Sequence, residues 1–74
     1  MRVEIVSAAE RLGLTTAGGA LKPLDSLTLL DLVMELEATF SITIPTTMLT
    51  LDRFESFDTL AALFEELRPV IERR

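Results

Sequence analysis

The chain has no cysteine, histidine, tryptophan or tyrosine among its 74 residues. Without cysteine there is no disulfide framework and no thiolate for catalysis or for binding zinc. Without histidine there is no side chain whose ordinary pKa would let it shuttle protons near neutral pH. Any thiol chemistry must therefore come from a group that the chain does not itself encode.

Aromatic residues are also scarce, because only four Phe are present although 49% of the residues are hydrophobic. This composition favours a helical core of Leu, Val, Ile and Phe over an all-β core. A chain of this length can fold as one small domain that buries only about 60% of its unfolded surface. We therefore expect a single all-α domain over residues 1–74.

Positive charge is nearly absent from the central part of the chain. Residues 25–66 contain nine carboxylates and only one cation, Arg53. Such a surface repels the phosphates of nucleic acids, whereas it attracts a basic protein partner. The charge distribution therefore predicts cationic protein partners and no binding of nucleic acid.

Long apolar runs are missing as well. Glu4 and Glu10 stand where a signal peptide would need an unbroken apolar segment, and Asp31 and Glu35 interrupt the most apolar later segment. We expect a monomeric cytoplasmic chain with no membrane association.

Hydrophobic spacing predicts a first amphipathic helix over residues 2–12. Its apolar residues recur at intervals of three, with Ile5 beside them: Val3, Val6, Ala9 and Leu12. The following segment contains two adjacent glycines and no periodicity, and Pro23 favours extended geometry in Lys22. Residues 13–24 are therefore predicted to form a loop.

The longest predicted helix covers residues 26–40, which contain no Gly or Pro and are rich in Leu, Glu and Met. Residues 41–45 alternate as a strand would, but no second segment is available to pair with them. An extended connector is therefore favoured over a sheet. Residues 46–53 are expected to hold one short helical turn.

Ser56 is the predicted N-cap of the last helix, and Asp58 in its first turn complements the helix dipole. The apolar residues Phe57, Leu60, Ala61 and Phe64 follow at helical spacing. Pro69 should end or kink this helix near Arg68, with residues 71–74 continuing as a frayed turn. Together the segments predict a small four-helix bundle with three longer helices and one short helix.

The helix over residues 26–40 has two apolar faces when it is projected at about 100° per residue. The core face comprises Leu29, Leu32, Val33, Leu36 and Phe40. The second face, here called the apolar patch, lies on the side of Ser26 and comprises Leu27, Leu30 and Met34. Glu37, Asp31 and Glu35 border this patch. An apolar surface with a charged rim is typical of a protein contact; alternatively, the patch is buried under the loop or the first helix.

Ser26 itself has two interpretations. Serine at a helix start is usually a plain N-cap, and neither Thr28 nor Leu29 is the residue expected to complete a capping box. A helix N-terminus also stabilises phosphate through its free N–H groups and its dipole. A phosphodiester on Ser26 would therefore be favourably placed.

Three motifs in the middle of the chain resemble the acyl carrier protein pattern. They are Asp25-Ser26-Leu27, the segment LVMELE at residues 32–37 followed by Phe40, and ITIP at residues 42–45. The family pattern has D-S-L, a helix of the type E-L-V-x-x-L-E-x-x-F and an I-x-I-P connector, so the match runs without a gap from Asp25 to Pro45. FESFDTL at residues 54–60 resembles the family's entry into its last helix. The chain departs from the pattern before the serine, where LKPL replaces a D-L-G-x type run.

The resemblance implies a bundle of the acyl-carrier-protein type in which Ser26 receives 4′-phosphopantetheine from coenzyme A. Acyl or aminoacyl groups would then be carried as thioesters on this arm while the protein performs no catalysis. The implied partners are a phosphopantetheinyl transferase, a loading enzyme, and downstream synthases or transferases with basic docking patches. The implied partner-binding residues are Asp25, Leu27, Leu30, Asp31, Met34, Glu35 and Glu37.

Several alternatives remain open at the level of the sequence. A free-standing aminoacyl or peptidyl carrier competes with a carrier of fatty-acid or polyketide synthesis. From another class, an unmodified helical module could use the same acidic helix to bind a basic protein. Catalysis by Asp31 and Glu35, spaced i, i+4, is disfavoured because exposed carboxylate pairs are usually a solvated face.

Overall fold

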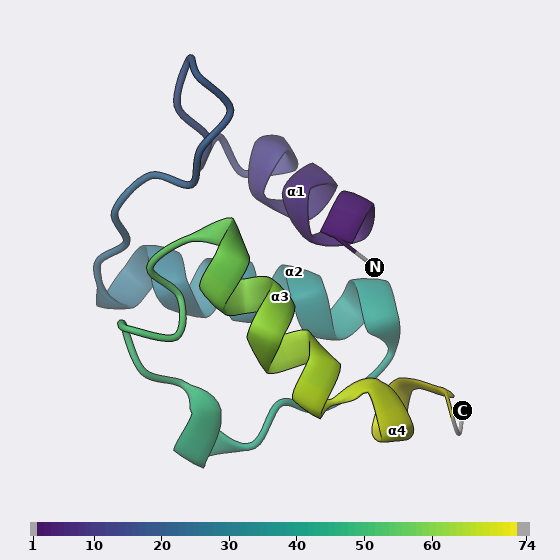
Figure 1. The fold of residues 1–74 in the computed structure, drawn as a ribbon. Helices are drawn as coiled ribbons and strands as arrows, with labels where there is room; N and C mark the ends of the chain where they lie inside the picture. Colours follow the sequence, from purple (N-terminus) through teal and green to yellow (C-terminus); the bar gives the residue numbers. More distant parts are fainter. Residues whose placement is uncertain (1, 73–74) are drawn as a thin grey trace.

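The computed structural model describes residues 2–72. Within these residues, four α-helices and one 3-10 helix follow one another along the chain, and Figure 1 shows how the helices are arranged. They are α1 (Arg2–Arg11), α2 (Ser26–Phe40), η1 (Thr46–Met48), α3 (Phe57–Glu66) and α4 (Arg68–Glu72). The predicted all-α class is confirmed, and α2 has the predicted bounds.

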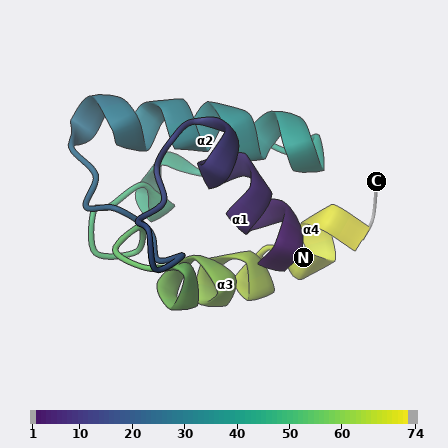
Figure 2. The same cartoon turned by 90° about the horizontal axis from the view of Figure 1, so that it is seen from above.

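The first helix joins the other two long helices of the fold. In Figure 2, α2 and α3 lie along opposite sides of the domain and α1 runs between them. Helix α1 contacts both of the others. At the far end of α2 the Phe40 ring meets the Phe64 ring of α3 with 4.9 Å between centroids. One shared core therefore joins the three helices.

That core is made only of apolar side chains within residues 2–72. The predicted core face of α2 is buried along its whole length. The largest fully buried side chains are Ile5, Leu32, Leu36, Phe54, Leu60, Leu63 and Phe64. Leucine and phenylalanine from separate helices thus fill the centre, as the composition predicted.

The predicted apolar face of α1 was wrong in part. Val3 and Leu12 are exposed, whereas Ile5, Ala8 and Ala9 are buried. A strict three-residue repeat drifts around a helix of 3.6 residues per turn, and Leu12 lies beyond the end of α1 at Arg11, one residue short of the predicted helix. Ile5 and Ala9 are buried as predicted, and Ala8 is buried in addition to them.

The first loop contains no helix, as predicted, but it is hydrogen-bonded. Thr15 and Leu21 form an isolated antiparallel bridge. The N–H of Lys22 donates to the carbonyl of Leu14 at 2.8 Å, and the N–H of Thr16 donates to the carbonyl of Ala20 at 2.7 Å. The loop therefore folds back on itself before it reaches α2.

The connector after α2 forms no strand, as predicted, and buries Ile42 and Ile44. Ser41 ends the helix in the left-handed region with φ of 54°. The predicted helical turn is η1. The connector stays outside any sheet because it has apolar side chains to bury but no neighbouring strand to pair with.

The prediction that the third long helix is the last one was wrong. Helix α3 ends at Glu66, and the separate helix α4 begins at Arg68. Pro69 lies in the first turn of α4, where its missing N–H has no acceptor within the helix. The proline therefore opens a helix after the break. Of the predicted frayed turn, residues 71–72 belong to α4, and residues 73–74 lie outside the described part. No helix in residues 2–72 is both long and apolar enough to span a bilayer.

Candidate functional site

The start of α2 is capped by Asp25. Its side chain accepts a hydrogen bond from the Thr28 N–H at 2.9 Å, and the Thr28 hydroxyl accepts one from the Asp25 N–H at 2.9 Å. This is a reciprocal capping box. The expectations that Ser26 is the cap and that Thr28 completes no box were wrong. The usual rule looks for Glu or Gln at this position, but the threonine hydroxyl accepts the same backbone N–H.

Because Asp25 takes the capping role, Ser26 becomes the first residue of the helix itself. Ser26 is exposed, and its hydroxyl takes part in none of the hydrogen bonds of the cap. The backbone N–H groups of a first helical turn lack intrahelical acceptors and favour nearby negative charge. The site therefore presents an uncommitted hydroxyl at the positive end of a helix.

The hydrogen bonds of the cap also change the pKa of the Asp25 carboxylate. Hydrogen bonds from the Thr28 N–H and then from the Thr28 hydroxyl lower the pKa of Asp25 below its ordinary value. The charged form of Asp25 is thus favoured by the cap. It remains exposed to solvent beside Ser26.

The apolar patch lies open on the same side of α2. Leu27 is 74% exposed, Leu30 is 50% exposed and Met34 is 67% exposed. The alternative that the first loop or α1 buries these side chains is therefore excluded. Asp31, between them in sequence, is also exposed.

The other two carboxylates of the predicted rim are engaged inside the domain. Glu35 accepts hydrogen bonds from Nε and Nη2 of Arg11 on α1, at 3.0 and 2.8 Å. Glu37 accepts from the Ile44 N–H of the connector at 2.7 Å. The structure thus brings Asp31 together with the patch but directs Glu35 towards α1 and Glu37 towards the connector. Sequence reasoning along one helix missed both partners because they lie on other elements.

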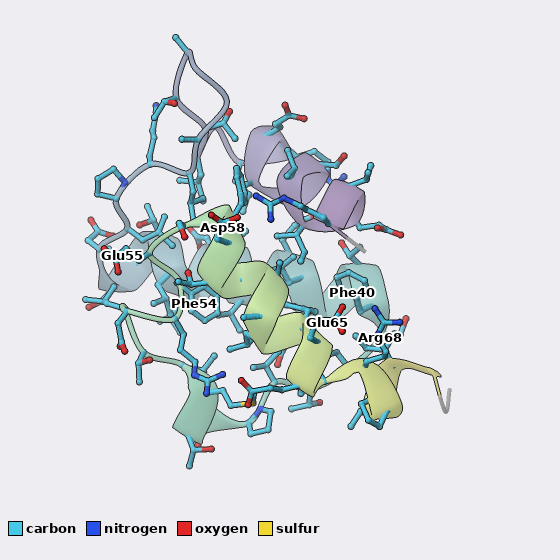
Figure 3. All side chains as sticks on the ribbon, in the orientation of Figure 1. Phe40, Phe54, Glu55, Asp58, Glu65 and Arg68 are labelled. Atoms are coloured by element: carbon cyan, nitrogen blue, oxygen red, sulfur yellow. The ribbon has the colours of Figure 1, made fainter. Side chains whose placement is uncertain are left out.

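An open cleft also lies beside the segment that leads to Ser26. Its volume is about 380 Å³, and it is lined by Leu21, Pro23, Leu24, Leu51, Asp52, Phe54 and Glu55. Figure 3 shows Phe54 within the domain and Glu55 at its edge, next to the start of α3. The sequence carried no signal for this cleft, because its two walls are 27 or more residues apart in the chain at Leu24 and Leu51.

A family model of the phosphopantetheine attachment site matches residues 3–67. The chain belongs to this family of phosphopantetheine-binding carrier proteins. No curated protein and no solved structure gives a significant match. A carrier of this family bears 4′-phosphopantetheine as a covalently attached group. The free hydroxyl at the start of α2 fits such a group, because it is open to solvent and already lies where a phosphodiester is stabilised.

Proposed function

We propose that Ser26 is the residue that bears 4′-phosphopantetheine, and that the chain is a non-catalytic carrier of acyl or aminoacyl groups for biosynthetic enzymes. The exposed, uncommitted hydroxyl of Ser26 on the first turn of α2 is the observation that supports this assignment most directly. The proposed settings are fatty-acid, polyketide or related natural-product synthesis.

The other serines are less suited to the attachment. The side chain of Ser56 accepts from the Thr59 N–H as the N-cap of α3, so its oxygen is already in use. Ser7 is half-buried on α1. Ser41 lies at the C-terminal end of α2, where the helix dipole is unfavourable for a phosphodiester. Ser26 combines exposure with a favourable helix end.

In the proposed modification, the Ser26 oxygen forms a phosphodiester with the phosphopantetheine portion of coenzyme A. Its proton passes to the modifying enzyme, and 3′,5′-ADP leaves. Asp25 and Thr28 keep the first turn of α2 folded around the modified residue. Once attached, the group supplies the terminal thiol that cysteine-free residues 1–74 lack, and acyl groups are carried there as thioesters.

The proposed partners are the phosphopantetheinyl transferase, an acyl- or aminoacyl-loading enzyme, and downstream synthases or transferases. The apolar patch and Asp31 are the proposed contact surface, since they are exposed on the helix that starts at Ser26. Asp25 lies at the edge of this surface. Glu35 and Glu37 contribute at most its margin, because each already has a partner within the domain.

Intact-mass measurement after incubation with coenzyme A and a broad-specificity phosphopantetheinyl transferase tests the attachment. Wild type and Ser56→Ala should each gain the mass of one phosphopantetheine group, whereas Ser26→Ala should gain none. Absence of a gain on wild type would favour an unmodified interaction module. An equal gain on Ser26→Ala would move the attachment elsewhere.

Loading trials on the modified protein address the cargo. A panel of acyl-CoA donors with an acyl transferase, and of amino acids with adenylating enzymes, separates the acyl from the aminoacyl carrier. A thioester is recognised by its mass and by its release with hydroxylamine. Loading from only one half of the panel would assign the cargo class.

A further inference from the structure

An open hollow of about 370 Å³ lies on the outer side of α1. It is lined by residues of this helix alone, which are Arg2, Val3, Val6, Ser7 and Glu10. At about 100° per residue these positions fall within about 140° of the helix circumference. Val3 is 75% exposed, whereas Ile5, Ala8 and Ala9 on the other side of the helix are buried. The hollow is therefore a face of α1 that is directed away from the core, here called the outer face.

The two ends of the outer face carry opposite charges. Arg2 and Glu10 are about 12 Å apart along the helix axis. Glu10 is exposed and forms no ion pair within residues 2–72. Arg2 has one ion pair, in which Nη1 lies 3.0 Å from Oδ1 of Asp58, and a guanidinium has five N–H donors in all. Both charges are therefore available to a partner.

A face with apolar side chains between two opposite charges is complementary to a second copy of itself. When two α1 helices lie antiparallel across a twofold axis, Arg2 of each copy meets Glu10 of the other. Val6 and Ser7, in the middle of the face, then lie next to the axis. Two equivalent ion pairs would thus flank one apolar contact.

The charge of the remaining chain disfavours contact between two copies elsewhere. The whole chain has a net charge of −5, and residues 25–66 contain nine carboxylates but only one cation. Helix α1, in contrast, carries two arginines and two glutamates. Like charges that face one another across an interface lower the affinity. Of the helices in residues 2–72, α1 is therefore the longest along which two copies can meet without a net repulsion.

We propose that the outer face of α1 is a homodimer contact, in which two copies of the chain pair their α1 helices antiparallel. The face measures only about 12 by 10 Å, which is much less than the roughly 800 Å² per partner of a stable interface. The dimer is accordingly weak, with a Kd of about 0.1–1 mM, and the expected monomer is the form in dilute solution. The contact leaves Ser26 free and does not depend on its modification.

Reversal of the two charges tests the pairing. Sedimentation equilibrium of wild type from about 0.02 to about 2 mM should show a monomer–dimer equilibrium. Arg2→Glu and Glu10→Arg should each lose this association, because like charges then meet across the axis. The double variant, which has the net charge of wild type, should regain it. Both changes suit the helix dipole, so circular dichroism should show unchanged helicity.

A matched pair of variants locates the contact. Val3→Asp and Leu27→Asp make the same change in charge at side chains that are 75% and 74% exposed. Val3→Asp should abolish the association because it introduces a carboxylate into the outer face. Leu27→Asp should leave the Kd within about twofold of wild type, because α2 takes no part in the contact.

Single cysteines give a second measurement, because the chain contains none of its own. Ser7→Cys places a thiol next to the proposed twofold axis, and Thr47→Cys places one on η1 as the control. In a glutathione redox buffer, Ser7→Cys should form the disulfide-linked dimer at least about tenfold faster than Thr47→Cys. Thr47 is exposed and Ser7 is half-buried, so accessibility alone would give the opposite order.

Three results would each overturn the dimer. They are a wild type that stays monomeric throughout this concentration range, a double variant that fails to regain association, and a loss of association in Leu27→Asp but not in Val3→Asp. The proposed function is judged separately by the mass gain at Ser26. Val3→Asp should still gain one phosphopantetheine group, so failure of the dimer and failure of the carrier assignment are distinguishable.

Discussion

The starts of α2 and α3 use the same hydrogen-bonding arrangement. Asp25 accepts from the Thr28 N–H at 2.9 Å, and Ser56 accepts from the Thr59 N–H at 3.2 Å. In each cap the threonine hydroxyl accepts the N–H of the capping residue in return. The two helices therefore begin with the same hydrogen-bonding pattern, and the N-cap residue is extended in both.

Their first turns face different surroundings. The residue after the cap is the exposed Ser26 in α2, but it is Phe57 in α3, which is only 6% exposed. The next residue is the exposed Leu27 in α2, but in α3 it is Asp58, which forms an ion pair with Arg2 of α1 at 3.0 Å. Helix α3 anchors its start in the core, whereas α2 leaves two residues at its start without a structural task. The start of α3 therefore stabilises the fold, whereas the start of α2 leaves Ser26 and Leu27 free for function.

The largest expected difference in the free energy of unfolding concerns Phe57, which anchors the start of α3 in the core. Phe57→Ala should lower the free energy of unfolding by about 3–5 kcal/mol, because it leaves a cavity in the core. Leu27→Ala should change it by less than about 1 kcal/mol, because little of that side chain is buried. Urea denaturation of both variants measures the contrast. Equal losses would show that α2 is anchored through its exposed side as well.

A smaller contrast concerns the two serines. Ser56→Ala should cost about 1 kcal/mol because it removes the N-cap of α3. Ser26→Ala should stay within about 0.5 kcal/mol of wild type, because Asp25 retains the cap of α2. Unfolding midpoints of the two variants in urea test this. A loss for Ser26→Ala as large as that for Ser56→Ala would mean that its hydroxyl supports the helix after all.

The smallest expected effect appears only in acid. The cap lowers the pKa of Asp25 in the folded state, so its stabilising contribution is complete above the unfolded value, which is about 3.9. That contribution is lost as the pH falls through the lowered folded value. Asp25→Asn keeps a capping side chain that does not titrate, so it should lose less stability than wild type over this pH range.

The measurement compares urea midpoints of wild type and Asp25→Asn at neutral pH and in that acidic range. The other carboxylates are common to both proteins, so the difference between the two pH responses isolates Asp25. Ser56→Ala should respond to acid as wild type does, since its cap carries no titratable group. Identical responses of wild type and Asp25→Asn would contradict the role of Asp25.

Features encoded by local spacing could be predicted from the sequence. The bounds of α2 and its core face follow from apolar spacing in a segment without Gly or Pro, whereas this spacing left the exposure of the apolar patch open. The cap of α3 was also predicted at Ser56. These features depend on neighbours within one helical turn, which the sequence places side by side.

The errors arose where a competing local partner or a distant element decides the outcome. Asp25 displaced Ser26 from the cap because a threonine hydroxyl can do what Glu or Gln usually does. The engagement of Glu35 depends on Arg11, which is 24 residues away. Helix α4 was missed because Pro69 was taken as a terminator, although a proline in a first turn is equally compatible with a new helix.

The hydrogen-bonded first loop has a consequence for any cargo on Ser26. The Lys22 N–H donates to the carbonyl of Leu14, close to the end of α1, and the Thr15–Leu21 bridge closes the segment between them. With the arm on Ser26, the thioester would move about an attachment point that is held in the folded domain, and not about one on an unstructured segment. The volume it searches would then be set by the length of the arm, which keeps its effective concentration high at a docked enzyme.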